Sequence, residues 1–144
     1  MNKLMLAATA VAGIGLCASA ADPVTYTWTG ATSTSWGRND NLINWKNESG
    51  NPCAFTIGAA KPYPNAYFSD LNTQNPLVET GEKPVYVNDV VFDIQEAFEF
   101  SFATGYGGFR ADVIESFTKK GPGLLTLRCG QSAYNFMGCA MKIE

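Results

Sequence analysis

The stretch FTKKGPGLLTLRCGQSAYNFMG, residues Phe117 to Gly138, decides the fold. In this stretch a Lys-Lys-Gly-Pro-Gly turn leads to an alternating apolar run with Leu125 and Leu127, and Gly130 then ends the strand. A single turn-strand-turn unit cannot keep water from its own apolar face, because its inward side chains need a neighbouring layer. The stretch therefore predicts short strands stacked on one another.

Length and composition fit one domain of that kind. The chain has 144 residues, of which 46% are hydrophobic, so it can bury a core without bridges or metals. Its 14 Gly and 7 Pro favour many turns over long helices. We expect an all-β chain with residues 21–144 as a single domain.

Charge and residue usage exclude several functions. The formal net charge of -3 provides no electrostatic footprint for nucleic acid or anionic lipid. The chain has no His, which removes Ser-His-Asp and Cys-His catalysis and imidazole metal sites. We therefore expect no enzyme activity, no cofactor, no metal and no nucleic-acid partner.

Residues 1–20 have the pattern of a signal peptide. Lys3 supplies the positive start, an apolar stretch runs from Leu4 to Leu16, and Ala18 to Ala20 supplies small residues before a cleavage site. The apolar stretch is shorter than the roughly 20 residues that cross a bilayer. We expect an exported bacterial protein in the periplasm, on the outer surface or outside the cell, without stable membrane insertion of the mature chain.

Three cysteines remain after this segment, namely Cys53, Cys129 and Cys139. A disulfide between Cys129 and Cys139 would close a short loop and leave one thiol over. The other interpretation, which we favour, is that all three are small apolar side chains in strands, because their spacing fits no metal motif.

Strand patterns run through much of the mature chain. In PVYVNDVVFDI, residues 84–94, the apolar parity shifts at Asn88-Asp89, which predicts a corner between two short strands. Phe98, Phe100 and Phe102 alternate with polar residues and are expected to point inward. Residues 50–75 predict irregular structure with single strands at 54–57 and 66–68.

Three tryptophans, Trp28, Trp36 and Trp45, lie in the region 21–50. We interpret them as an aromatic cap that covers one end of the stack, with each indole N–H finding a partner at the rim. The alternative is a carbohydrate-binding module in which the three rings form a surface platform for sugars.

Carboxylates are the only groups that suggest catalysis. Asp89 and Asp93 lie four residues apart and would suit a glycan hydrolase if they faced one groove. We favour solvated outer strand faces instead. The run 39–41, Asn-Asp-Asn, offers oxygen ligands for calcium, but a turn explains it equally well.

The order of these motifs resembles a known family. Residues 120–127, KGPGLLTL, followed by Gly130, Tyr134 and Gly138, are similar to the autotransporter-associated β-strand repeat, K-x-G-x-G-x-L-T-L-x-G. Residues 26–30, YTWTG, with Trp36 and the pair at 44–45, resemble the opening of proteins with such repeats. The segment 89–93, DVVFD, resembles a rung between the two.

This resemblance implies a β-solenoid, a right-handed parallel β-helix, with coils over 84–144 that include one repeat at 117–138. The implied function is a non-enzymatic structural or adhesion module at the cell surface, with extracellular glycans or other surface proteins as partners. Family members usually carry several repeats and often a membrane barrel. One repeat is present here, so we expect an incomplete solenoid from a truncated product, with an unpaired edge at its last coil.

Overall fold

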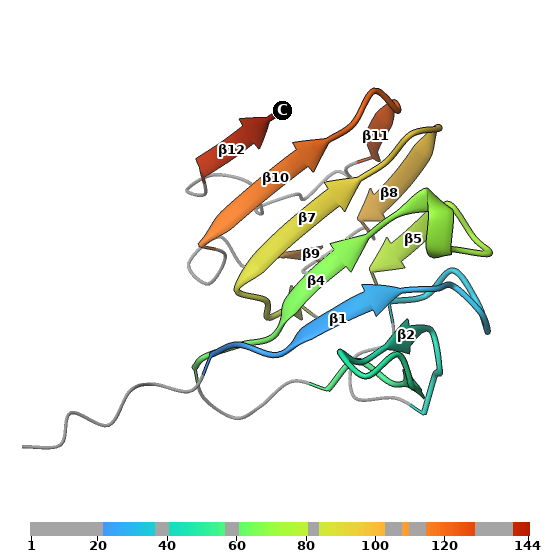
Figure 1. Ribbon diagram of the computed structural model, residues 1–144, viewed down its shortest axis with the longest axis vertical. Coiled ribbons are helices and arrows are strands. Elements are labelled where there is room, and N and C mark those ends of the chain that lie inside the picture. Colours follow the sequence, from blue (N-terminus) through green and yellow to red (C-terminus); the bar gives the residue numbers. More distant parts are fainter. Residues whose placement is uncertain are drawn as a thin grey trace, which may run out of the picture.

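The computed structural model of the chain is shown in Figure 1 and describes residues 22–36, 41–56, 61–80, 84–102, 108–109, 115–128 and 140–144. These residues form strands joined by irregular segments, with one 3-10 turn, η1 (Asp70–Asn72), and no α-helix among them. The strands are β1 (Thr25–Trp28), β2 (Trp45–Lys46), β3 (Pro52–Cys53), β4 (Asn65–Phe68), β5 (Leu77–Thr80), β6 (Pro84–Val85), β7 (Asp89–Asp93), β8 (Phe98–Phe102), β9 (Gly108–Phe109), β10 (Ser116–Lys120), β11 (Leu125–Arg128) and β12 (Ala140–Ile143).

The strands form three sheets, and most neighbours are parallel. The seven-stranded sheet has the order β12-β10-β7-β4-β1-β2-β3, in which the first five strands run parallel to one another. The three-stranded sheet β11-β8-β5 and the pair β6-β9 are parallel throughout. The expected all-β class is confirmed at this level.

Parallel neighbours require the chain to return to its starting side between strands. It does so by way of the other sheets, because β4, β5 and β6 lie in the three sheets in turn and β7, β8 and β9 repeat that route. The next segment again places β10 beside β7 and β11 beside β8. Segments far apart in sequence therefore lie side by side (Figure 1).

The corner expected at Asn88-Asp89 is present. It separates β6 from β7, which belong to different sheets, and Val90, Phe92 and Ile94 are buried after it. The side chain of Asn65 in the neighbouring strand accepts hydrogen bonds from Asn88 Nδ2 at 3.1 Å and from the Asp89 backbone N–H at 3.2 Å. The shift in apolar parity is thus a change of sheet.

The glycines of the Gly-Pro-Gly turn lie directly on the preceding turn of the chain. Gly121 has φ +73, and a Cβ there would lie 2.4 Å from the Ile94 carbonyl oxygen. A Cβ on Gly123 would lie 2.1 Å from the Glu96 carbonyl oxygen, and the Gly123 N–H donates to Ile94 O at 3.0 Å. Any larger residue would separate the two turns.

That preceding turn is itself held by the corner before it. Oδ2 of Asp70 in η1 accepts hydrogen bonds from the backbone N–H groups of Gln95, at 2.7 Å, and Glu96. Three corners, at 70, 95–96 and 121–123, therefore succeed one another, each in contact with the next. Backbone groups that would otherwise be unsatisfied at each corner are satisfied by its neighbour.

The core lies between the seven-stranded and the three-stranded sheets and is rich in aromatic rings. Phe68 and Phe92, on adjacent strands, stack with ring centroids 4.5 Å apart and an interplanar angle of 10°. Phe98 and Phe100 from β8 meet them edge-on, as expected from their alternation. Each such buried side chain contributes roughly 1.5–3 kcal/mol. Phe102 has its side chain outside the described residues, so its expected inward orientation remains a prediction.

One prediction for residues 50–75 is wrong, and one strand that follows them was not predicted. The expected strand at 54–57 is absent from the described residues 54–56, where Phe55 is instead a buried core residue without strand pairing. A strand was not expected at β5, but Leu77–Thr80 pairs in parallel with β8. The expected strand at 66–68 is confirmed as β4.

Candidate functional site

The three tryptophans that sequence analysis singled out lie together inside the molecule. Trp28, Trp36 and Trp45 are all at most 1% exposed. Trp36 and Trp45 have ring centroids 4.7 Å apart, and Trp28 meets Trp45 edge-on at 5.0 Å. They belong to the end of the core that is bordered by β1, β2 and β3.

The indole N–H groups of two of the three donate to backbone carbonyl oxygens. Trp28 Nε1 donates to Asn75 O at 3.1 Å, and Trp45 Nε1 donates to Trp36 O at 2.9 Å. A sugar-stacking platform needs exposed ring faces, which these side chains do not offer. The burial contradicts the alternative interpretation, in which the three rings lie on the surface, because aromatic packing in the core has taken up their faces.

The acids considered for catalysis hold neighbouring strands together. Asp89 Oδ1 accepts a hydrogen bond from Ser116 Oγ at 2.6 Å, and Asp93 Oδ2 accepts one from Tyr67 Oη at 2.8 Å. A further acid, Glu99 on β8, lies 2.5 Å from the guanidinium of Arg128 on the paired strand. Each acid has a cross-strand partner, which is the arrangement of a sheet surface.

The bond between Tyr67 and Asp93 changes the titration of the phenol. Burial, followed by the hydrogen bond to Asp93 and the repulsion of its negative charge, raises the pKa of Tyr67 to about 12 from 10.0. The native state therefore retains this proton between pH 10 and pH 12, where the unfolded chain loses it. The resulting stability is fully present below pH 10 and is lost as pH rises through about 12.

We predict that Asp93→Asn lowers the pKa of Tyr67 but leaves it above 10, because the effect of burial remains. Alkaline titration followed by tyrosinate absorbance measures this, and a Tyr67→Phe variant identifies the curve that belongs to Tyr67. An unchanged pKa in Asp93→Asn would show that the two side chains do not interact.

Other sequence candidates fall partly outside the described residues. Cys129 and Cys139 lie there, so the disulfide stays a prediction, as do residues 39–40 of the Asn-Asp-Asn run and the signal segment 1–20. Cys53 is a half-buried free thiol whose pKa is raised by burial. Among the residues that the structure describes, no group of acids and cysteines is arranged to hold a metal ion.

An opening lies at the other end of the core. It is a hollow of about 360 Å³ between β10 and β12 of the seven-stranded sheet and β11 of the three-stranded sheet. We call it the terminal hollow. Its walls are chiefly Phe117, Leu125, Leu127 and Ile143, with Lys119 and Lys142 at its border. The sequence motifs do not predict this hollow.

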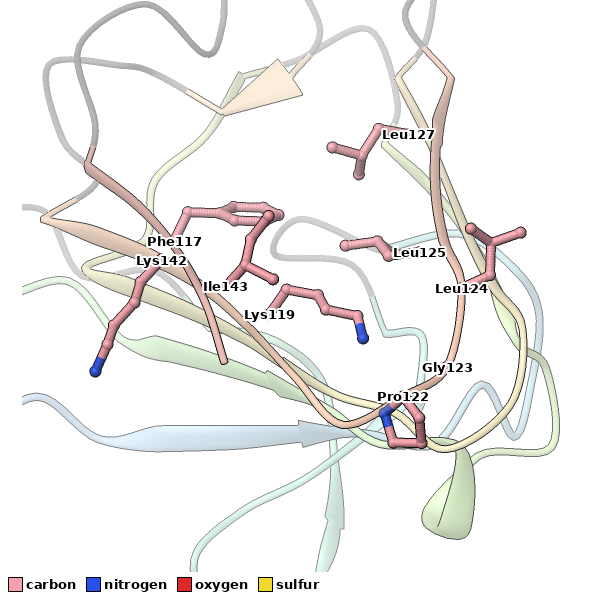
Figure 2. A pocket seen from close by; sticks show the side chains of 9 residues that line it. All are labelled: Phe117, Lys119, Pro122, Gly123, Leu124, Leu125, Leu127, Lys142 and Ile143. Atoms are coloured by element: carbon pink, nitrogen blue, oxygen red, sulfur yellow. The ribbon is translucent and has the colours of Figure 1, made fainter.

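The side chains of the terminal hollow come from both sheets. Figure 2 shows Leu125 and Leu127 on β11 pointing toward Phe117 and Ile143 on the opposite wall, whereas Lys142 points away. Ile143 is 79% exposed. The hollow is therefore an apolar surface without a covering layer in the described part of the chain.

Lys119 is the exception on the inner side of β10. It pairs with Phe92 in register, and its ammonium donates to the carbonyl oxygen of Gly121. Lys119 thus takes the position that Phe92 occupies in β7 and Phe68 occupies in β4. The described residues that line the hollow include two lysines, Lys119 and Lys142, and no carboxylate.

A search of protein-family models, of curated proteins and of solved structures finds no match to this chain. The similarity to the autotransporter-associated repeat therefore depends on the residues quoted above. Within the described residues, no helix has the length and hydropathy needed to cross a membrane.

Proposed function

We propose that the protein is a non-enzymatic, exported β-solenoid module that serves as a structural or adhesive element at the bacterial cell surface. The observation that carries this proposal is the repeated route of the chain through three sheets with parallel register. In a solenoid each coil contacts its neighbours and hides their apolar faces, which suits a stiff, extended scaffold. The right-handed parallel β-helix implied by the resemblance is the specific form that we propose.

The stacked corners support this form. The two glycines that match K-x-G-x-G, Gly121 and Gly123, lie where one turn of this chain meets the turn before it. The motif therefore has a physical role that is independent of any chemistry at a site. Residues at the motif are used for stacking coils.

The surfaces left after stacking support a role in contact with other molecules. Asp89, Asp93 and Glu99, the acids considered above, bond across strands, and the terminal hollow has apolar walls. We propose other surface proteins or extracellular glycans as partners, bound through exposed loops and edges. The buried tryptophans contribute to this role by keeping one end of the core closed.

Export provides the experimental test. An epitope-tagged full chain and a variant lacking residues 1–20 are expressed in Gram-negative cells, which are then fractionated and treated with protease while intact. We expect the full chain to leave the cytoplasm with its leader removed and the variant to remain inside. A full chain that stays in the cytoplasm with residues 1–20 attached would contradict the proposal.

A further inference from the structure

The two edges of the seven-stranded sheet are protected to different degrees. One edge is β3, which is only two residues long and contains the exposed Pro52, a residue without a backbone N–H to donate. The other edge is β12, which has four residues and no proline. Short strands and prolines block pairing at an edge, so β3 is closed to a further strand and β12 is open.

The backbone of β12 has hydrogen-bonding groups that point away from the sheet. Glu144 N–H donates to Lys119 O at 2.9 Å, and Ile143 is the register partner of Lys119 in this parallel pair. In a strand, the N–H and C=O of one residue point to the same side, and those of the next residue point to the other side. The N–H and C=O of Ile143 therefore point away from β10, where no strand of the described residues lies (Figure 1).

The side chains of β12 also differ between its two faces. Ile143 faces the terminal hollow, whereas Lys142 points away from it (Figure 2) and forms an ion pair with Glu144, the residue after β12. The open backbone edge thus adjoins the exposed apolar wall of the hollow. A partner that satisfied the edge would cover Ile143 at the same time.

We propose that this edge pairs with the same edge of a second copy, so that β12 lies antiparallel to the partner's β12 with Ile143 on the two-fold axis. In an antiparallel pair of strands, two residues lie opposite each other and can both point their N–H and C=O groups toward the other strand. Such a pair forms two hydrogen bonds. Ile143 and the partner's Ile143 meet this requirement. Their side chains then face each other and extend the apolar walls of the two hollows.

Charge favours a second copy over other partners in this arrangement. With Ile143 on the axis, Lys142 lies opposite the partner's Glu144, and Glu144 lies opposite the partner's Lys142. Opposite charges directly across an antiparallel pair stabilise it, and like charges destabilise it. A shifted register in which Ile143 still points its backbone groups at the partner would place Lys142 opposite the partner's Lys142. The repulsion between these two charges disfavours that register, so we expect Ile143 to lie on the axis.

The closed edge at β3 determines the size of the assembly. A head-to-tail contact would need two complementary ends and would continue into a filament. Because β12 is the open one of the two edges of the seven-stranded sheet in the described part of the chain, the proposed contact joins two identical surfaces and stops at a dimer.

The test is sedimentation equilibrium of the purified full chain from micromolar to near-millimolar concentration, with native mass spectrometry of the same samples. We expect a monomer–dimer equilibrium whose dissociation constant rises about tenfold or more in Ile143→Lys, which places two ammonium groups on the axis. The control is Leu71→Lys, because Leu71 is 80% exposed in η1, away from β12, and this change should leave the equilibrium as it is. Circular dichroism confirms that each variant is folded.

A reciprocal charge exchange tests the register even if Ile143→Lys does not fold. Lys142→Glu alone should weaken the dimer, and the combined Lys142→Glu and Glu144→Lys variant should restore it. A monomer at every concentration, a series of larger species, a dimer unaffected by both changes, or a monomer that retains a small amphiphile in native mass spectrometry would each overturn the proposal. A combined variant as weak as Lys142→Glu would overturn the register with Ile143 on the axis.

Discussion

Replacing Trp36 with alanine is expected to lower the free energy of unfolding by about 3–5 kcal/mol. Trp36 is 1% exposed, and its ring packs against Trp45, Phe55 and Phe68 with centroid separations of 4.7, 4.9 and 5.5 Å. Removing the ring leaves a cavity lined by rigid aromatic groups, which cannot collapse to fill it. Urea unfolding followed by tryptophan fluorescence and circular dichroism measures the loss.

Two variants accompany this measurement. Trp36→Phe keeps an aromatic ring in the same place and is expected to lose less than Trp36→Ala. Leu71→Ala removes a side chain that is 80% exposed and should change stability by no more than about 0.5 kcal/mol. If Trp36→Ala were as stable as the original chain but no longer bound glycans, the surface platform would be correct and the buried cluster wrong.

Replacing Gly121 with alanine is expected to be far more destabilising than the same change at Gly50. Both glycines have a left-handed backbone, with φ +73 and φ +78, which costs alanine about 1–2 kcal/mol at either position. At Gly50 a Cβ meets nothing within 4 Å, whereas at Gly121 it meets the Ile94 carbonyl oxygen at 2.4 Å. We expect Gly121→Ala to lose a further 1–3 kcal/mol or so from this overlap.

The difference between the two variants isolates the contact between stacked turns, because the backbone strain is common to both. Gly123→Ala supplies an independent check, since its loss would come from the overlap with Glu96 O at 2.1 Å without a left-handed backbone. Chemical denaturation of the three variants gives the free energies. Equal losses at Gly50 and Gly121 would mean that the turns at 94–96 and 121–123 are not in contact.

Several features of the fold could be predicted because short-range chemistry determines them. The parity shift at Asn88-Asp89 marked a corner, since apolar side chains cannot point inward on both sides of it without a change of direction. The alternation around Phe98 and Phe100 marked an inward face for the same reason. In each case the residues that carry the signal are those that make the contact.

Other features depended on partners far away in the sequence. In β5, Val78 and Thr80 are buried and Glu79 is exposed, which is the alternation of a strand. The sequence hides this alternation, because apolar Leu77 is not on the buried face and buried Thr80 is polar. The strands β2 and β3 have two residues each and are defined only by their pairing. Propensity over so few residues carries little information.

The candidate site shows the same limit. The terminal hollow exists because strands from 116–120, 125–128 and 140–143 meet around it, and no single stretch of sequence shows that they meet. Lys119 offers the local signal that sequence analysis missed. It is a charged residue at an inward position of a strand whose other inward residue, Phe117, is buried, and it marks where the apolar column of Phe68 and Phe92 stops.

The stacking of parallel coils is tested most directly by nuclear Overhauser effects between backbone protons of the three central strands. The structure aligns Val91 with Tyr67 on one side and with Thr118 on the other, both in parallel. We predict cross-strand effects from Val91 to both residues, with the same parallel offset repeated at Val90 and Phe92. Effects that instead link these strands in antiparallel register, or that follow the short spacing of a helix, would contradict the account.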